Sequence, residues 1–451
     1  MPRQGAQRRH RRRNLRQRAG AAHPGPARPR RPPGGPHRRS PRRRAPSLRG
    51  CHPAHRAHRP PAVRAQRRVA EEDRRLVRRG PLVRLNVPIT DAAEIAAVTA
   101  VLESGFLTQG PRAAEFENLV GSWVGTSRAY AVSSATTGLH LALHAVGVKP
   151  GDEVIIPDFS FPATANAVIQ QGAIPVFVDI DIDTFNLDPS RLEAAITSRT
   201  TAIMPVHAFG LCADMDPINE IAARHSLPVI EDAACALAGT YKGRQAGSLA
   251  TAGVFSFHPR KIITTGEGGM IMTDDEELGN KIQVLRTHGA VRGELFMSFI
   301  DAGYNYRLSD VHAAIGVAQM AKLAGITEGR HERADSLTER LAGLDGVRTP
   351  VVPEGTRHAY QSYVVLLDDD IDRDAVIRAM KSRDIETTLG TYGMHLQPYF
   401  RDRFGIEDAA LPVSTRAHNQ ALTLPLYPQL TDSDLDLIAE KLAESIVAVR
   451  S

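Results

Sequence analysis

The stretch DEVIIPDFSFPATANAVIQQGAIPVFVDID, residues 152–181, decides the fold. Strand-like runs rich in isoleucine and valine stand at its two ends, at residues 152–158 and 174–181, and a helical pattern lies between them at residues 162–173. Continuous apolar runs are typical of strands that are buried on both faces, and a strand, a helix and a strand in succession join parallel neighbours. The stretch therefore predicts a βαβ unit.

The same alternation continues on both sides of this unit. Further strands are predicted at residues 129–134, 201–207, 227–234, 253–257 and 268–274, most of them separated by helical patterns. Strands that alternate with helices form a mostly parallel sheet with helices on both faces. The predicted fold class is therefore α/β.

The last third of the chain has a different texture. A long helical stretch at residues 309–344 is followed by a predicted strand at 360–367 and a C-terminal helix at 431–449. We therefore expect a large mostly parallel-sheet domain over residues 81–340 and a small α+β domain over residues 341–451.

Residues 1–80 form an arginine- and proline-rich tail. They hold 26 arginines, no lysine and three acidic residues, a net charge of +23 in a chain whose formal net charge is +6. With so few apolar residues the tail is predicted to be disordered. One alternative is a nucleic-acid-binding arm, but no aromatic residues interleave the arginines. We expect instead an upstream stretch translated from an over-early start, and no nucleic-acid binding by the acidic body.

The cellular location, and the absence of a membrane segment, disulfides and a metal, are predicted from features that the sequence lacks. No apolar run reaches the roughly 18 residues of a membrane span, and the tail has no apolar signal-peptide core. The three cysteines are odd in number and show no metal-ligand spacing. We expect a cytoplasmic protein without a membrane segment, a disulfide framework or a metal.

One lysine, Lys261, has sequence neighbours that are typical of a reactive residue. The segment FSFHPRKIITTGEGG, residues 255–269, places Lys261 between a strand and a glycine-rich turn, in a chain with only seven lysines among 56 basic residues. A lysine amine can lose its proton and attack an aldehyde, which an arginine cannot do near neutral pH. The alternative is an ordinary surface lysine.

Small and hydroxyl residues stand where a strand passes into a helix, at Ser133, Ser134, Ala135 and Thr136. The free N–H groups at the start of a helix bind phosphate, and the hydroxyl of Ser256 could reach the same group. Ordinary helix capping is the alternative interpretation.

Two further residues follow predicted strands. Asp232 ends a buried strand, where a carboxylate is costly unless it meets a cation such as a protonated pyridine nitrogen. Phe161 could stack on a flat heteroaromatic ring. A helix cap and a core position are the respective alternatives. Together with Lys261, these residues make up the parts of a pyridoxal-phosphate enzyme.

Several segments of the chain also resemble those of a known family, the DegT/StrS-type sugar aminotransferases. They run from about residue 85 to residue 445 and include SSATTGLHLAL, IEDAACALAGTYKG, FSFHPRKIITTGEGGM and GYNYRLSDVHAAIG. The Ser-Phe-His-x-x-Lys element followed by Gly-Glu-Gly-Gly is the most specific of them. The resemblance implies a fold-type I pyridoxal-phosphate-dependent transferase.

The resemblance also assigns roles to cofactor-binding residues. Lys261 would hold pyridoxal 5′-phosphate covalently and shuttle a proton, Asp232 would keep its ring nitrogen protonated, and Phe161 would stack on the ring. The phosphate would be bound by Ala135, Thr136 and Ser256.

Three more residues are assigned by the resemblance alone. Asn305 would reach the phosphate in a neighbouring subunit, because members of the family are typically homodimers with shared active sites. Arg307 would help to hold that cross-subunit segment near the substrate. His395 stands where the substrate-facing histidine of the family falls.

The sequence departs from the family pattern near the site. Cys235 replaces the usual glutamine or histidine near the phenolic oxygen of the cofactor, and a thiol is a weak hydrogen-bond donor. His312 stands where glutamine or asparagine is common. These departures concern the surroundings of the site and leave the lysine chemistry untouched.

The function implied is transfer of an amino group from L-glutamate to a nucleotide-linked keto-sugar, such as a nucleoside-diphosphate 4-keto-6-deoxyhexose, in amino-sugar and polysaccharide biosynthesis. One alternative is a cyclitol or keto-inositol aminotransferase of the same family. Another is a regulatory protein that binds the cofactor or a sugar without turnover. Dehydratases of the family carry histidine in place of the lysine, so Lys261 argues against that activity.

Overall fold

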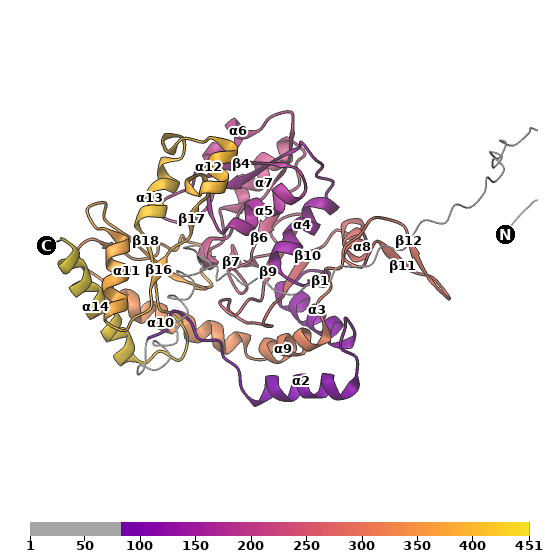
Figure 1. The fold of residues 1–451 in the computed structure, drawn as a ribbon, viewed down its shortest axis with the longest axis horizontal. Coiled ribbons are helices and arrows are strands. Elements are labelled where there is room, and N and C mark those ends of the chain that lie inside the picture. Colours follow the sequence, from indigo (N-terminus) through magenta and orange to yellow (C-terminus); the bar gives the residue numbers. More distant parts are fainter. Residues whose placement is uncertain (1–82, 451) are drawn as a thin grey trace, which may run out of the picture. The chain divides into compact units, whose positions relative to one another are not determined.

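The computed structural model describes residues 83–450 (Figure 1). The tail predicted to be disordered, residues 1–80, lies outside the described residues. The described residues belong to one compact unit.

The βαβ unit predicted from residues 152–181 is confirmed. Strand β2 (Glu153–Pro157) leads through α5 (Pro162–Gln170) into β4 (Ile174–Val178), and β2 and β4 pair in parallel. Proline at the first position of α5 suits a helix start, because that N–H has no partner within a helix.

The same sheet continues from β2 in the other direction. Its further strands are β5 (Thr200–Ile203), β6 (Ile230–Asp232), β9 (Ala252–Ser256), β10 (Gly269–Thr273) and β1 (Arg128–Val132). Strand β5 pairs in parallel with β2, and isolated parallel bridges connect its end to β6. Strand β6 pairs in parallel with β9, whereas β10 runs antiparallel to both β9 and β1. The sheet is therefore mostly parallel, as the sequence predicts.

Helices cover both faces of this sheet. In β2, Ile155 packs into one core while Val154 and Ile156 pack into the other, since successive side chains point to opposite faces. The first core is closed by α3 (Pro111–Val124), α7 (Met215–Arg224) and α9 (Asp310–Met320), and the second by α4 (Ala135–Ala145), α5 and α8 (Glu276–Leu285).

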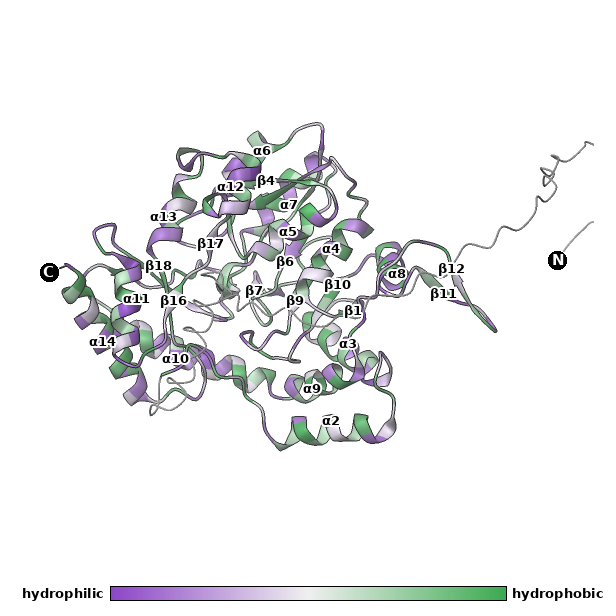
Figure 2. Cartoon of the chain, in the orientation of Figure 1, coloured by the Kyte–Doolittle hydropathy of each residue, from purple (hydrophilic) through white to green (hydrophobic). Residues whose placement is uncertain are grey.

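The C-terminal part has a separate antiparallel sheet in the order β13-β15-β18-β16. Its strands are β13 (Val347–Arg348), β15 (Tyr363–Leu367), β18 (Ala421–Leu424) and β16 (Thr388–Leu389). Its helices are α11 (Arg373–Ser382) and α14 (Asp432–Arg450), and Figure 2 shows both hydrophobic and hydrophilic residues along α14. The buried residues of α14, such as Leu435 and Ile438, face the core of this sheet.

The long helical stretch predicted at residues 309–344 is two helices, α9 and α10 (Leu323–Leu341). Helix α10 contributes Ala334, Leu337 and Leu341 to the C-terminal core, so it crosses the predicted domain boundary at residues 340 and 341. That boundary stays a prediction. The segment PSRLEAAITSRT, residues 189–200, also has a helical sequence pattern, but in the structure α6 spans only Leu192–Ala195.

The other α-helices and strands of residues 83–450 are α2 (Ala92–Ser104), β3 (Phe159–Ser160), β7 (Thr240–Tyr241), β8 (Arg244–Gln245), β11 (Ala290–Arg292), β12 (Met297–Phe299), β14 (Thr356–Arg357), β17 (Tyr392–Gly393), α12 (Pro398–Phe404) and α13 (Pro412–Gln420). Within residues 83–450 we find no helix whose length and apolar character would let it cross a membrane.

A glycine at the start of β10 lets the sheet approach α4 closely. A Cβ atom on Gly269 would lie 2.6 Å from the carbonyl carbon of Ser134 and 2.7 Å from the backbone nitrogen of Ala135. We expect Gly269→Ala to lower the free energy of unfolding by about 2 kcal/mol, because backbone atoms cannot move aside as a side chain can. Urea unfolding followed by circular dichroism measures the change.

Gly325→Ala is the matched control, because a Cβ at this position of α10 meets no atom within 4 Å. Alanine favours a helix over glycine by up to about 1 kcal/mol, so this variant should be at least as stable as the parent. Equal stability of the Gly269 variant and the parent would contradict the close approach.

Candidate active site

A cavity of about 610 Å³ opens at the carboxyl ends of the parallel strands. Open α/β sheets bind ligands at this edge. The predicted site residues that line the cavity are Ala135, Thr136, Phe161, Asp232, Ser256 and Lys261. The structure thus brings together side chains that are separated by up to 126 positions in the sequence.

Asp232 lies at the end of β6 and is buried, with one carboxylate oxygen accepting a hydrogen bond from Thr164 Oγ1 at 2.7 Å and the other from the Ala234 N–H at 3.2 Å. Burial raises the pKa of the Asp232 carboxyl, and these hydrogen bonds and the charge of Lys261 oppose the shift only in part. A carboxyl in this state is suited to a cationic partner inside the cavity.

Thr164 contacts the predicted site, although the sequence pattern did not point to it. Its hydroxyl lies between the Asp232 carboxylate and Ser160 Oγ, which is 2.8 Å away. The signal was present, because Thr164 comes three residues after Phe161 in the first turn of a predicted helix. Its partner, however, is far away in sequence and only the fold shows the contact.

The start of α4 provides free backbone donors. Ser134 is the N-cap, and its hydroxyl accepts a hydrogen bond from the Thr137 N–H at 3.1 Å. Capping satisfies that donor, whereas the first N–H groups of a helix, here those of Ala135 and Thr136, have no acceptor within the helix. Ser256 also lines the cavity, so the predicted phosphate-binding residues share one wall of it.

Lys261 follows a turn that closes with a hydrogen bond from its own N–H to the His258 carbonyl oxygen at 2.8 Å. Its Nζ donates to Cys235 Sγ at 3.0 Å. The residue that departs from the family pattern, Cys235, therefore contacts the amine directly. Both residues line the cavity.

Phe161 is the N-cap of α5 and lines the cavity with 65% of its surface exposed. An aromatic ring that lies open to a cavity can stack on a flat ring system. The Phe161 ring can therefore cover one face of a flat ligand.

Asn305 and Arg307 do not line this cavity. Asn305 forms an isolated antiparallel bridge with Thr287, and Arg307 forms one with Val132. Both follow the hairpin of β11 and β12. The cross-subunit roles of Asn305 and Arg307 stay predictions.

His395 does not line this cavity, and its substrate-facing role stays a prediction. The side chain is fully buried, with Nδ1 2.6 Å from Asp158 Oδ2 and Nε2 3.1 Å from Thr415 Oγ1. Both ring nitrogens thus have partners, and His395 is not among the lining residues. The sequence motif located the histidine but could not show that Asp158 takes it into the core.

The residues fit pyridoxal phosphate. The buried Asp232 carboxyl matches a protonated ring nitrogen, the uncovered Phe161 ring matches a flat ring, and the α4 start matches a phosphate. Lys261 supplies the amine that reacts with an aldehyde.

Comparisons with known proteins agree with this fit. The sequence pattern of the DegT/DnrJ/EryC1/StrS aminotransferase family matches residues 88–443. The chain is 40% identical over 374 residues to the spore coat polysaccharide biosynthesis protein SpsC of Bacillus subtilis, covering 80% of this chain and 96% of that protein. It is 39% identical over 371 residues to the GDP-perosamine synthase of Caulobacter vibrioides, covering 81% and 99% of the two chains.

A solved structure shows the same fold with the cofactor. It is the PLP form of a putative sugar aminotransferase from Streptococcus pneumoniae, with a TM-score of 0.78, 28% identity, and coverage of 81% of this chain and 99% of that one. The fold-type I prediction is confirmed. The chain therefore belongs to the DegT/DnrJ/EryC1/StrS aminotransferase family and is a pyridoxal-phosphate-dependent transaminase.

Proposed function

We propose that this transaminase moves the amino group of L-glutamate to a nucleotide-linked keto-sugar in amino-sugar and polysaccharide biosynthesis. One observation carries the proposal: the cavity that holds Lys261 and Asp232 is also lined by amide and hydroxyl side chains from the C-terminal part of the chain. These are Gln361, Ser362, Thr388, Thr391 and Thr423. Such groups both donate and accept hydrogen bonds, which suits the hydroxyls of a sugar.

The relatives support a sugar substrate. One is a protein of spore coat polysaccharide biosynthesis, another a GDP-perosamine synthase, and the matching structure a putative sugar aminotransferase. Within the proposal, the acceptor is a nucleoside-diphosphate 4-keto-6-deoxyhexose or a close relative. A cyclitol acceptor would use the same amine chemistry, and incubation of the aminated enzyme with a keto-inositol in place of the keto-sugar would distinguish the two acceptors.

When bound, the cofactor supplies an aldehyde that carries the amino group and a ring that takes up electrons. Lys261 holds the cofactor at rest. With its amine free, Lys261 Nζ would remove the proton from the α-carbon of the donor, and in the second half of the reaction it would return a proton to the carbon of the sugar that becomes aminated.

Asp232 acts on the electronics of the site. Its carboxylate would hold a proton on the ring nitrogen of the bound cofactor. Thr164 and the Ala234 N–H fix the orientation of the carboxylate by donating to its two oxygens. Phe161 covers one face of the ring and excludes water from it.

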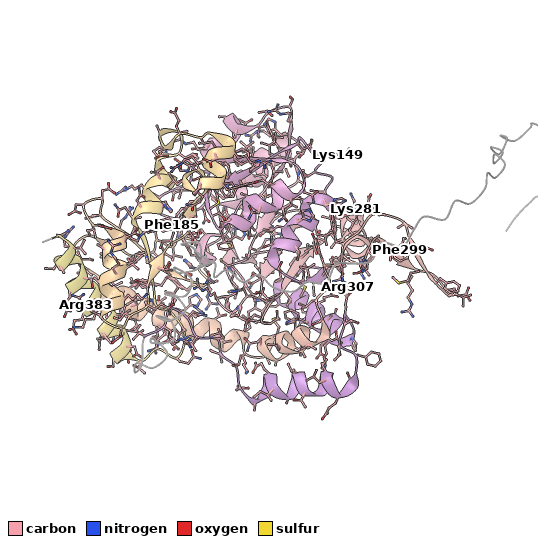
Figure 3. The ribbon with its side chains drawn as sticks, in the orientation of Figure 1. Lys149, Phe185, Lys281, Phe299, Arg307 and Arg383 are labelled. Atoms are coloured by element: carbon pink, nitrogen blue, oxygen red, sulfur yellow. The ribbon has the colours of Figure 1, made fainter. Side chains whose placement is uncertain are left out.

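The proposal includes a homodimer. The hairpin of β11 and β12 carries apolar side chains that are largely exposed: Leu295, Phe296, Met297, Phe299 and Ile300. Figure 1 shows this hairpin extending away from β10 and β1, and Figure 3 marks Phe299 on it. A contiguous exposed apolar patch marks an interaction site, and Asn305 follows the patch closely in sequence. A second copy of the chain is the proposed partner.

We further propose a cytoplasmic location. Cys212 and Cys235 are free thiols among the described residues, and Cys235 contacts the reactive amine. A reducing compartment keeps such a thiol in the state that the structure shows.

Lys261→Ala should lower turnover more than about a thousandfold, because the variant loses both the covalent anchor and the proton carrier. The assay follows the absorbance of the bound cofactor after addition of L-glutamate. Borohydride reduction and digestion should place the cofactor on the peptide that contains Lys261. Lys149→Ala, which changes an exposed lysine outside the cavity (Figure 3), should leave both results unchanged. Normal turnover without Lys261 would refute its role.

Asp232→Asn should slow turnover by about a thousandfold while leaving the cofactor-free protein stable. Because burial raises the pKa of this carboxyl, protonation favours the folded state, and stability is lost as the pH rises through the folded-state pKa. Asparagine removes that ionisation. The cofactor-free variant should therefore melt no lower than the cofactor-free parent at pH 8, with the parent gaining stability relative to it as the pH falls.

Scanning calorimetry of both cofactor-free proteins at pH 5 and pH 8 checks the stability part. A large loss of stability at pH 8 would assign Asp232 a structural role. Unchanged turnover would show that the ring nitrogen needs no carboxylate here.

Phe296→Glu should shift the protein from dimer to monomer and reduce its cofactor content, since a charge in a buried apolar contact is costly and Asn305 would leave the neighbouring site. Light scattering coupled to size-exclusion chromatography measures the mass. Val447→Glu, at an exposed position of α14, is the control and should change neither property. A dimeric Phe296 variant with full cofactor content would remove the hairpin from the interface.

A further inference from the structure

The turn that precedes Lys261 is held by its backbone. The Pro259 carbonyl oxygen accepts a hydrogen bond from Asn86 Nδ2 at 3.1 Å, and the Arg260 carbonyl oxygen accepts one from Gln361 Nε2 at 2.8 Å. The Arg260 N–H donates to His258 Nδ1 at 3.2 Å. The main chain of Arg260 is therefore fixed on both sides.

A buried arginine ties the two clamping residues together. Arg330 donates to Asn86 Oδ1 at 2.6 Å and to the carbonyl oxygens of Tyr360 and Leu426 at 3.0 Å each, with a longer contact of 3.4 Å to that of Gln361. Asn86 and Gln361, which hold the turn, are thus both held by Arg330. The position of the turn is set by a rigid network that joins α10 to the C-terminal sheet.

The guanidinium of Arg260 stays free in this arrangement. It makes no hydrogen bond or ion pair within residues 83–450, although its backbone makes two. Among the described residues it is the only arginine that lines the large cavity. A fixed main chain and a free cationic side chain place an unpaired guanidinium in the wall of the substrate cavity.

The other charged residues that line the cavity leave Arg260 as the cation that is available to a substrate. Its acidic lining residues are Asp232, which has its own hydrogen-bond partners, and Glu267. The Lys261 amine would be bound to the cofactor and is therefore not available as a free cation. Arg260 is therefore the permanent cation available to an anionic substrate, and a guanidinium pairs with carboxylate or phosphate oxygens through parallel N–H groups.

We propose that Arg260 forms the anion subsite of the cavity and binds the charged group of the substrate that lies away from the reacting carbon. This inference rests on the proposed function, whose two substrates both carry such a group. In L-glutamate it is the distal carboxylate, and in a nucleotide-linked sugar it is the diphosphate. Both substrates enter the same cavity in turn, so one guanidinium can serve either.

The test measures binding and needs no turnover. The cofactor-loaded enzyme is titrated in a calorimeter with 2-oxoglutarate, with 2-oxopentanoate, which lacks the distal carboxylate, and with inorganic pyrophosphate. In Arg260→Met, 2-oxoglutarate or pyrophosphate should bind at least about tenfold more weakly, while 2-oxopentanoate binding is unchanged. Loss with 2-oxoglutarate identifies the donor as the source of the anion, loss with pyrophosphate the acceptor, and loss with both a shared subsite.

Two further variants sharpen the result. Arg260→Lys keeps the charge without the paired donors and should recover part of the affinity. Arg378→Met removes an exposed arginine of α11 outside the cavity and should leave every affinity unchanged.

Unchanged affinity of Arg260→Met for both anions would overturn the subsite, as would an equal loss for 2-oxopentanoate. A variant that binds both anions normally but loses its dimer would assign Arg260 to the subunit interface instead. These outcomes are separate from the failure of the proposed function, because an enzyme that does not use L-glutamate would still show the loss of anion affinity.

Discussion

A carboxyl group buried at the end of β6 is the constraint on which the site depends. Asp232 has left water for a position where burial raises its pKa, and the hydrogen bonds from Thr164 and Ala234 compensate this only in part. The sheet places the group at its carboxyl edge, where the cavity opens. A cation that enters the cavity therefore gains more from this carboxylate than it would in water, and a protonated ring nitrogen is such a cation.

The site also depends on a buried arginine of α10, Arg330. Arg330 is buried and its pKa is lowered to about 10 by burial, yet it donates only to carbonyl oxygens and to Asn86. Through Asn86 and Gln361 it holds the turn before Lys261. The reactive amine thus stands on a turn whose position depends on the packing of α10 against the C-terminal sheet.

Much of the fold could be predicted because its signals are local. The apolar runs of β2 and β4 and the helical pattern between them suffice for a parallel pair, since both the strand period and the crossover rule act within 30 residues. Predictions failed where tertiary contacts decide. Helix α6 is shorter than its pattern suggested, and the stretch predicted as one long helix breaks between α9 and α10.

The sequence by itself determined the chemistry of this protein: a lysine that can attack an aldehyde, an aspartate at a strand end and hydroxyl residues at a helix start. These residues carry their reactivity wherever they stand. Only the tertiary structure decided that His395 is buried against Asp158, that Cys235 contacts Lys261 and that the Arg260 guanidinium lines the cavity with no hydrogen-bond or ion-pair partner among residues 83–450. The physical reason is that the partners of these side chains come from residues far away in the sequence. A local sequence pattern does not specify which distant residues the fold brings into contact.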